Sequence, residues 1–508
     1  MSKYDYSKLQ NGSDIRGVAI DGVPGETVNL NKETTMRLAK AFLYWLTSKT
    51  GKDPASLTIS IGRDPRLSGP GLADAFRQAL VSYGCRILDA GIASTPAMFM
   101  STIFAEYQCD GAIMVTASHL PFNRNGFKFF DCEGGLDKGD ITDIITFAES
   151  DSILNSIQGR EPGEVEKIPL LDTYSAHLRE LIAEGAGLGE KPLAGMRITV
   201  DAGNGSGGFF ATKVLAPLGA DISSSQYLEP DGNFPNHAPN PEDQKAMEAI
   251  CSRVKEVKSD LGLIFDTDVD RSSAVDEKGR EINRNGIVAM AAALIAEAHP
   301  GTTVVTDSIT SNQLTAFLEK DLGLKHLRFK RGYKNVINKS IQLNQAGIDS
   351  QLAIETSGHA AYKENYFLDD GAYLATKIVI KAAKLHHAGQ GISALIATMK
   401  MPAESIEVRF PILAEDFSAY GNQIIDDLQT LVASDQLQGA SLVTPNYEGV
   451  RINFDTPSLK GWMLLRKSLH DPIMPLNIES DVEGGCEAIK KLLKPILATY
   501  AELDISKL

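Results

Sequence analysis

Short apolar runs alternate with amphipathic segments along most of this chain. Two of the amphipathic segments, at 36–49 and 69–84, place apolar side chains at helical spacing. A strand–helix–strand rhythm of this kind predicts parallel sheets covered by helices, and uninterrupted apolar strands suit sheets that are buried on both faces. The strand-like runs are LTISIG (57–62), GAIMV (111–115), RITVDAG (197–203), LGLIFD (261–266), TTVVTD (302–307) and QLAIET (351–356).

Several of these runs end in a polar cluster. The clusters are TASH after Val115, DAGNGSGG after Val200, DTDVDR after Phe265, TDSITSN after Val305 and ETSGH after Ile354. In open parallel α/β sheets, ligands bind beyond the carboxyl ends of the strands. The pattern therefore predicts several α/β units whose strand ends face a shared ligand cleft.

The rhythm changes after about residue 401, where EVRFPI and GVRINF form short strand-like runs without intervening α/β units. We expect a separate α+β domain there. Polar, glycine-containing stretches at 159–170 and 185–195 suggest a linker, and AHPGTT separates the apolar helix expected at 287–298 from the next strand. The predicted domains are 1–185, 186–298, 299–401 and 402–508.

Length, net charge and cysteine content limit the number of domains and the kinds of partner that the protein can have. With 508 residues, three or four domains are expected. The net charge of -15 argues against nucleic acid or an anionic membrane as a partner. The five cysteines form no CxxC pair, which favours reduced thiols in the cytoplasm. No secretory signal and no apolar run long enough to cross a bilayer stands out.

The run FDTDVDR carries the strongest chemical signal. Asp266, Asp268 and Asp270 alternate, so in an extended segment their carboxylates project to the same side. Three such charges repel one another unless a cation joins them, and hard oxygen ligands suit Mg²⁺ or Ca²⁺. An EF-hand would need glycine where Arg271 stands, and a haloacid-dehalogenase-type Asp-x-Asp-x-Thr motif would need threonine where Asp270 stands.

The run TASHLPFNRNGFK places Ser118 directly after a buried strand. Ser118 and His119 are adjacent, which implies no hydrolase dyad, and the nucleophile elbow G-x-S-x-G is absent. A polar loop with Ser118 as a helix cap is the simpler reading. Lys128 favours another one, because a cation near a serine suits an anion such as a phosphoserine.

Two later loops carry weaker signals. ETSGH combines Glu355, Ser357 and His359, which can hydrogen-bond a polyol. LLRKSLHDP contains Arg466 and further polar side chains that could clamp a phosphate. Either loop alone is more simply a polar turn. SDIRG and GRDPRLSG add three arginines near the N-terminus, which are Arg16, Arg63 and Arg66.

Taken together and in order, SDIRG, GRDPRLS, TASHLP, DTDVDR, ETSGH and RKSLHDP resemble the α-D-phosphohexomutase superfamily, which includes phosphoglucomutases and phosphomannomutases. The resemblance covers almost the whole chain. It implies four domains around a central cleft, namely three related α/β units with mixed sheets and a smaller C-terminal α+β domain. It also implies interconversion of hexose 1-phosphates and 6-phosphates through a phosphoserine and a hexose 1,6-bisphosphate.

The resemblance further implies a role for individual residues. Ser118 matches the phosphoryl carrier and a metal ligand, and the Mg²⁺ ligands beside it match Asp266, Asp268 and Asp270. The remaining catalytic matches are Arg16, Lys128, His119 and His359. The substrate-binding matches are Arg271, Lys330, Glu355, Ser357, Arg466, Ser468 and His470. The implied partners are small sugar phosphates, with no nucleic acid and no membrane, for a monomer or homodimer in the cytoplasm.

Some positions depart from the family pattern. Leu120 stands where asparagine is usual, Leu469 and His470 stand in place of a Gly-Thr or Asn-Thr pair, and Ile354 replaces glycine before Glu355. Thr356 occupies a variable position of the sugar loop, where dual-specificity enzymes often have Met and glucosamine mutases have Gln. The sugar therefore stays open. Phosphoglucosamine mutase and a non-catalytic sugar-phosphate-binding relative are the alternatives to a glucose or mannose mutase.

Overall fold

The computed structural model describes residues 5–437, 439–457, 459–468 and 471–508. The chain divides into two compact units. The first comprises Met1–Leu294 and Ser357–Leu395, and the second comprises Ile295–Thr356 and Ile396–Leu508.

The N-terminal part of the first unit is built on a mixed sheet of order β1-β2-β6-β5-β3-β4-β8, with β7 paired to β6. β3 pairs in parallel with β4 and β5, whereas β6 runs antiparallel to β5 and β2. Its strands are β1 (Gln10–Asn11), β2 (Asp14–Val18), β3 (Thr58–Arg63), β4 (Arg86–Ile92), β5 (Gly111–Val115), β6 (Arg124–Asp131), β7 (Gly134–Gly135) and β8 (Val165–Lys167).

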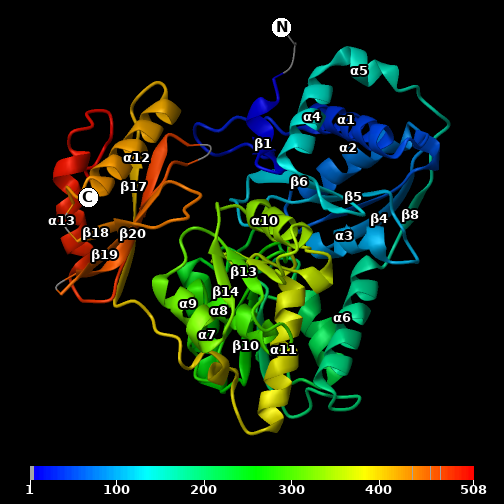
Figure 1. The fold of residues 1–508 in the computed structure, drawn as a ribbon. Coiled ribbons are helices and arrows are strands. Elements are labelled where there is room, and N and C mark those ends of the chain that lie inside the picture. Colours follow the sequence, from blue (N-terminus) through cyan, green and yellow to red (C-terminus); the bar gives the residue numbers. More distant parts are fainter. Residues whose placement is uncertain (1–4, 438, 458, 469–470) are drawn as a thin grey trace. The chain divides into compact units, whose positions relative to one another are not determined.

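Helices cover both faces of this sheet. α1, α2, α4 and α5 lie on one side and α3 on the other (Figure 1). The helices of this region are η1 (Ser7–Leu9), α1 (Lys32–Thr50), η2 (Pro54–Ser56), α2 (Gly69–Val81), α3 (Thr95–Ile103), α4 (Lys138–Glu149), α5 (Asp151–Ser156) and α6 (Leu170–Ala186).

An aromatic cluster joins the helices to the sheet. Phe42 of α1 stacks on Phe129 of β6 with ring centroids 4.9 Å apart, and Phe76 of α2 lies 5.2 Å from Phe127. All four rings are buried, and burying a side chain of this size stabilises the fold by about 1.5–3 kcal/mol. This core fixes β6 beside β5 and thereby positions the loop between them.

A second mixed sheet of the first unit has the order β12-β11-β10-β9. β9 and β10 are parallel, and β10 and β11 form an antiparallel hairpin. α7 and α11 pack against it. The elements are β9 (Ile198–Asp201), η3 (Phe210–Leu215), η4 (Ala216–Leu218), α7 (Gln244–Val257), β10 (Leu261–Phe265), β11 (Ser272–Val275), β12 (Glu281–Ile282), α8 (Asn285–Ala296), β16 (Ala360–Tyr362), η6 (Lys363–Asn365), α11 (Gly371–His387) and η7 (Ile392–Ile396).

The second unit begins with three parallel strands in which β13 lies between β14 and β15. α10 packs on β13 and β15, and the π-helical η5 packs on β14. The elements are β13 (Thr303–Thr306), α9 (Asn312–Ala316), η5 (Phe317–Asp321), β14 (Lys325–Arg328), α10 (Tyr333–Gln345) and β15 (Leu352–Ile354).

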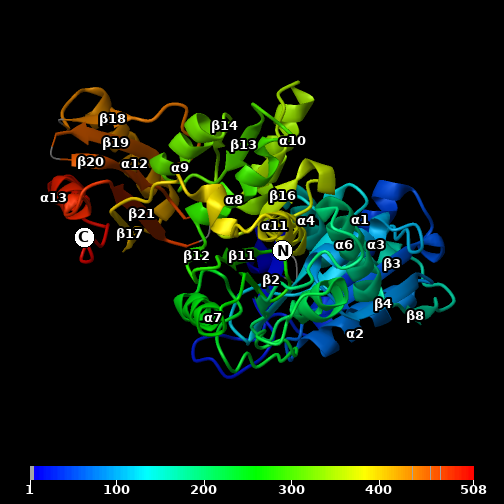
Figure 2. The ribbon, with the colours of Figure 1, turned by 90° about the horizontal axis from the view of Figure 1, so that it is seen from below.

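The C-terminal part of the second unit is an antiparallel sheet of order β17-β21-β20-β19-β18. α12 and α13 share one core with it, and Figure 2 shows these elements together in orange and red. The elements are β17 (Glu404–Pro411), α12 (Phe417–Ala433), β18 (Ala440–Leu442), β19 (Val450–Thr456), β20 (Leu459–Leu465), β21 (Ile473–Ser480) and α13 (Gly485–Leu497).

The predicted fold class is confirmed, with three α/β regions and a C-terminal α+β region. The sheets are mixed, as the family resemblance implies. The alternation of strands and helices predicted their parallel pairs but not the antiparallel strands β6 and β11, which return as hairpins. The apolar segment at 287–298 forms most of α8 and is largely buried. In the described part of the chain, no helix combines the length and apolarity needed to traverse a bilayer. The domain boundaries given above stay predictions.

Candidate active site in the first unit

Ser118 lies in the turn that connects β5 to β6, and its side chain is fully buried. Its backbone is in the left-handed region with φ of 49°, and its N–H donates to Thr116 Oγ1 at 2.9 Å. No helix begins at this serine, because the next element is β6. The helix-cap reading of the sequence is therefore wrong, and the hydroxyl has another partner.

Arg66 holds this turn in place through its guanidinium. Its guanidinium donates to four carbonyl oxygens, those of Ser118 at 2.5 Å, Leu120 at 2.6 Å, Pro121 at 2.7 Å and Arg124 at 3.1 Å. The side chain of Arg66 is completely buried, and its Nε lies 3.2 Å from Asp64 Oδ2. Burial raises the pKa of Asp64 to about 6, although the charge of Arg66 opposes that rise.

The three aspartates converge immediately after β10. Asp266, Asp268 and Asp270 are fully buried, and ligand atoms from all three lie within 4.8 Å of one another. The convergence does not come from an extended strand, as the alternation suggested, because the backbone turns at Val269 with φ of 68°. Strands β10 and β11 flank the loop, which excludes an EF-hand.

The electrostatics of this loop fit a bound cation. Burial, and then the charges of Asp270 and Asp268, hold the pKa of Asp266 well above its usual range. Asp268 Oδ1 and Asp270 Oδ1 are buried without a hydrogen-bond partner among the described residues. Buried carboxylate oxygens that lack hydrogen-bond partners are donors that suit a hard divalent cation.

Ser118 and Lys128 both reach this triad. Ser118 Oγ donates to Asp266 Oδ2 at 2.9 Å. Lys128, buried on β6, donates to Asp270 Oδ2 and lies 3.5 Å from Asp268 Oδ2. Burial opposes ionisation of Asp270, but the charges of Lys128, His359 and Arg271 together outweigh it and lower the pKa of that carboxyl below its usual range. The structure thus brings together the serine, the lysine and the three carboxylates.

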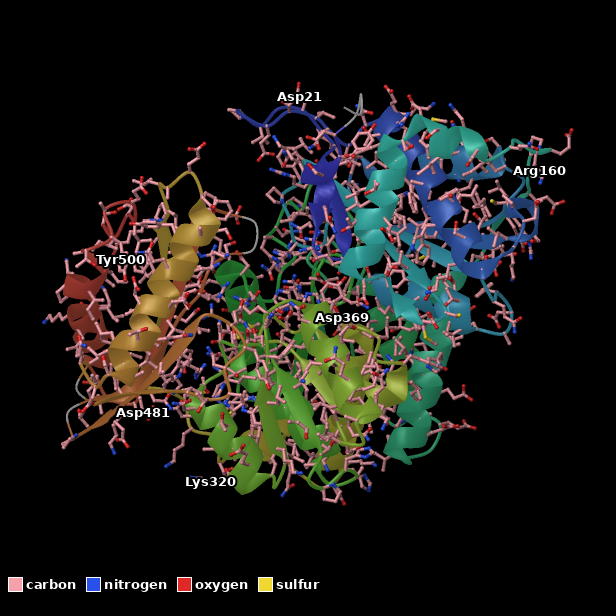
Figure 3. The ribbon with its side chains drawn as sticks, turned by 45° about the horizontal axis from the view of Figure 1, so that its top comes forward. Asp21, Arg160, Lys320, Asp369, Asp481 and Tyr500 are labelled. Carbon is pink, nitrogen blue, oxygen red and sulfur yellow. The ribbon has the colours of Figure 1, made fainter. Side chains whose placement is uncertain are left out.

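His359 sits in a chain of three polar side chains. Arg271 Nε donates to His359 Nε2 at 2.8 Å, and His359 Nδ1 lies in hydrogen-bond contact with Asp369, whose position Figure 3 marks. Because Nε2 accepts the bond from arginine, the proton is on Nδ1 and points to Asp369. The tautomer and the ring orientation of His359 are therefore fixed.

His119 and Arg16 complete the first unit's set. His119 Nδ1 is 3.4 Å from Ser118 Oγ, and burial together with the charges of Arg271 and Arg16 lowers the pKa of His119 to about 2. His119 is thus a neutral neighbour of the serine. Arg16 lies on β2 opposite Gly126 of β6, and its guanidinium pairs with Asp14 at 2.9 Å.

The other predicted residues fall into two groups. Ser357, in the first unit, is 4% exposed, and its hydroxyl has no hydrogen-bond partner within the described ranges. Lys330, Glu355, Arg466 and Ser468 belong to the second unit. Glu355 accepts the N–H of Gly332 at 2.7 Å, whereas Lys330 is exposed. His470 lies outside the described residues.

Sequence reasoning missed two residues that order this site. Thr95, at the start of α3, donates its hydroxyl to Asp268 Oδ2 at 2.5 Å and its N–H to the carbonyl of Asp268 at 2.8 Å. Asp369 contacts His359. The Asp-Asp-Gly run at 369–371 is the signal in the sequence that could have indicated Asp369. No signal in the sequence linked Thr95 to the loop that contains Asp268.

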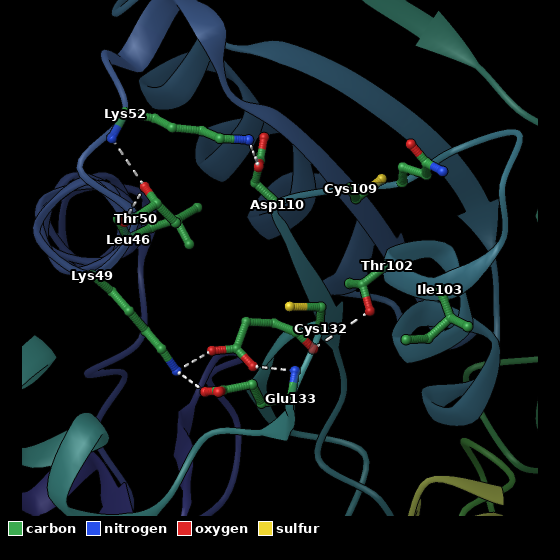
Figure 4. Close-up of a pocket in the computed structure, with 12 residues that line it drawn as sticks. Leu46, Lys49, Thr50, Lys52, Thr102, Ile103, Cys109, Asp110, Cys132 and Glu133 are labelled. Atoms are coloured by element: carbon green, nitrogen blue, oxygen red, sulfur yellow. Dashed lines mark hydrogen bonds and ion pairs between the residues drawn. The ribbon is translucent and has the colours of Figure 1, made fainter.

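A separate cavity of about 610 Å³ opens in the first unit, between the C-terminal end of α1 and β6 (Figure 4). Lys49 contacts Asp131 and Glu133 there, and Lys52 contacts Asp110. Since acidic partners neutralise both lysines, this cavity does not have the character of a phosphate site.

Three family models match, described as phosphoglucomutase/phosphomannomutase alpha/beta/alpha domain I (residues 7–151), domain II (residues 172–279) and domain III (residues 283–401). A phosphomannomutase/phosphoglucomutase of Pseudomonas putida is 30% identical over 97% of each chain.

Two solved structures are also similar. A phosphoglucomutase/phosphomannomutase family protein of Burkholderia thailandensis superposes with a TM-score of 0.76 at 25% identity, covering 97% of this chain and 98% of the other. N-acetylphosphoglucosamine mutase of Aspergillus fumigatus, in complex with GlcNAc-6P and magnesium, has a TM-score of 0.52 at 14% identity over 80% and 91% of the two chains. The latter likeness concerns the fold alone.

Proposed function

Because the chain belongs to the phosphoglucomutase/phosphomannomutase family and is therefore a hexose-phosphate mutase of the isomerase class, we propose that Ser118 carries its phosphoryl group. The substrate proposed is the 1-phosphate or 6-phosphate of glucose, mannose or both. The contact of Ser118 Oγ with Asp266, beside Lys128 on Asp270, carries this proposal.

The reaction consists of two phosphoryl transfers. In the first, the Oγ–P bond of phosphorylated Ser118 breaks and an O–P bond to a free hydroxyl of the hexose phosphate forms. The sugar hydroxyl loses a proton and Ser118 Oγ gains one, so the products are a hexose 1,6-bisphosphate and free serine. In the second transfer, the other phosphate of the bisphosphate returns to Ser118.

Proton movement accompanies each transfer. We assign it to Lys128 or His359, which are held by Asp270 and Asp369 respectively. His119 is neutral beside the serine and serves as a hydrogen-bonding neighbour. Arg16 and Arg271 add positive charge near the phosphoryl group, which bears negative charge throughout the transfer.

Asp266, Asp268 and Asp270, with the phosphate of Ser118, are the proposed ligands of Mg²⁺. The ion, when bound, supplies positive charge that neutralises the transferring group. The three aspartates place this site beside Ser118, and the hydroxyl of Thr95 orients the carboxylate of Asp268.

The bisphosphate must present each of its phosphates to Ser118 in turn. One clamp for the substrate's own phosphate therefore has to accept the sugar in two orientations. We assign this clamp to Arg466 and Ser468, with the sugar hydroxyls bound by Glu355 and Ser357. Hexose 1,6-bisphosphate is the proposed intermediate and activator.

A coupled assay with glucose, mannose and glucosamine 1-phosphates tests the proposal, with Mg²⁺ and hexose 1,6-bisphosphate added. Ser118→Ala should abolish turnover and remove the phosphoryl group seen by intact-mass analysis, whereas the exposed Ser48→Ala should change neither. Full mutase activity in Ser118→Ala would refute the assignment. The family models and curated relatives do not favour a glucosamine mutase or a non-catalytic relative.

A further inference from the structure

A buried carboxylate in the second unit connects the sugar loop to the loop that follows β14. Asp307 directly follows β13 and is fully buried. Its Oδ2 accepts the hydroxyl of Thr356 at 2.8 Å and lies 3.6 Å from Arg331 Nε. Asp307 therefore positions the guanidinium of Arg331, a planar group whose donors suit a phosphate.

The backbone of Arg331 is held by the turn that precedes β19. Glu448 accepts the N–H of Arg331 at 3.2 Å and contacts the hydroxyl of Ser308. The next residue, Gly449, packs so closely on Arg466 that a Cβ at Gly449 would lie 2.9 Å from Arg466 Cβ. The Glu448–Gly449 turn thus brings the loop of Arg331 beside Arg466, since β19 and β20 pair at Val450 and Leu465.

Arg466 is a buried cation whose charged neighbours include Arg331 and the carboxylates of Asp307, Glu407 and Glu448. Arg466 Nε is buried and has no hydrogen-bond partner in the part of the chain that the structure describes. Burial, and then the charge of Arg331, lowers the pKa of Arg466. Two guanidinium groups held so that they repel each other are stabilised by an anion that binds between them.

We propose that Arg331 is a second arginine of the clamp for the substrate's own phosphate, acting together with Arg466. This inference rests on the proposed function. It differs from the assignment that the family resemblance gives to this loop, in which the neighbouring Lys330 contacts the substrate. Lys330 is exposed, whereas the side chain of Arg331 is 27% exposed and is oriented by Asp307.

The first measurement is steady-state kinetics with glucose 1-phosphate. Arg331→Ala should raise KM about 10–100-fold with a much smaller change in kcat, as expected for the loss of a charge-assisted hydrogen bond to a bound phosphate. Arg331→Lys, which keeps the charge but loses the planar fork, should fall between Arg331→Ala and the wild type. Lys320→Ala, which removes an exposed cation of the same unit, should match the wild type (Figure 3).

The second measurement is calorimetric titration with inorganic phosphate, which needs no turnover. Arg331→Ala and Arg466→Ala should each weaken phosphate binding, and the double variant should lose less than the sum of the two single losses. Unchanged phosphate affinity in folded Arg331→Ala and Arg331→Lys would overturn the inference, as would strict additivity. If the wild-type protein turned over no hexose phosphate but the two substitutions remained non-additive in phosphate binding, the proposed function would be refuted. The joint phosphate binding by Arg331 and Arg466 would still be supported.

Discussion

Arg66→Met is expected to release the loop that carries Ser118. The substitution keeps an unbranched apolar side chain in the same space but removes the guanidinium that donates to four carbonyls between Ser118 and Arg124. It also leaves Asp64 buried without its cation. Removing one partner of a buried ion pair costs about 3–5 kcal/mol, because the other charge stays desolvated.

The loss of stability should affect this loop before it affects the whole fold. Hydrogen exchange of residues 116–124 reports the opening free energy of this loop without requiring the whole chain to unfold at once. We expect that free energy to fall by about 3–5 kcal/mol in Arg66→Met. Since a displacement of about 1 Å costs on the order of 100-fold in rate, kcat should fall by about that factor and phosphorylation of Ser118 should slow.

The effect should also depend on pH. The pKa of Asp64 is already raised to about 6, so the folded state holds a proton that the unfolded state has released. Stability contributed by this group is therefore lost as pH rises through that range, and without Arg66 the loss should be larger and extend to higher pH. Below about pH 6 the folded state of both proteins holds this proton, so the difference in stability between Arg66→Met and wild type should be constant, and above about pH 6 it should widen.

Arg86→Met is the matched control. Arg86 is half exposed and pairs with Glu166 at 2.6 Å on the surface, where an ion pair is worth up to about 1 kcal/mol. The Arg86→Met variant should show the hydrogen-exchange rates of wild type in residues 116–124 and the kcat of wild type. Wild-type exchange and wild-type kcat in Arg66→Met would show that the buried guanidinium does not hold the loop, and the reasoning would be refuted.

Three further outcomes are expected. Leu120→Asn should leave kcat/KM within about threefold of wild type, because Leu120 contributes its backbone carbonyl to Arg66; abolished activity would contradict this. Asp268→Asn should weaken Mg²⁺ binding at least about tenfold by calorimetry, and unchanged affinity would move the metal elsewhere. His237 bonds Asp201 at 3.0 Å and a carbonyl at 2.9 Å, and although burial opposes protonation, the bond to Asp201 raises its pKa. His237→Gln should therefore destabilise the protein by about 1.5–3 kcal/mol below about pH 6, and by less as pH rises through that raised pKa. If chemical denaturation gave the same difference in unfolding free energy at every pH, a positive charge on His237 would be excluded.

The sequence predicted where chemistry collects, because the cause is local. An apolar strand that ends in polar residues places them at a sheet edge, and this put Ser118 and the three aspartates at strand ends. Antiparallel neighbours such as β6 and β11 were not predictable from alternation, because a hairpin and a crossover share the same apolar strand pattern. Thr95 and Asp369 were missed because their partners lie on other elements.

The loop after β14 illustrates a different limit. The resemblance assigns a substrate contact to Lys330, which stays a prediction, but it carries no information on the direction of the neighbouring side chains. Arg331 lies one position away, where Asp307 contacts its guanidinium and Glu448 accepts its backbone N–H. Tertiary contacts of this kind leave no trace in local spacing.

Backbone strain is the feature of this site furthest from the reach of the sequence. Ser118 and Val269 both adopt positive φ, which glycine would accept without cost, and for a β-branched residue such as Val269 it is a real outlier. Strain of about 1–3 kcal/mol at each residue persists only where the surroundings over-determine the conformation. At Ser118 that surrounding is the guanidinium of Arg66 with its four carbonyl partners. At Val269 it is the full burial of the side chain and a hydrogen bond from Gly371 N–H to its carbonyl at 3.1 Å. Ser118 and the loop of the three aspartates are thus held in their strained conformations by groups that perform no chemistry, so the loss of Arg66 should release the strain at Ser118 without removing a reacting group.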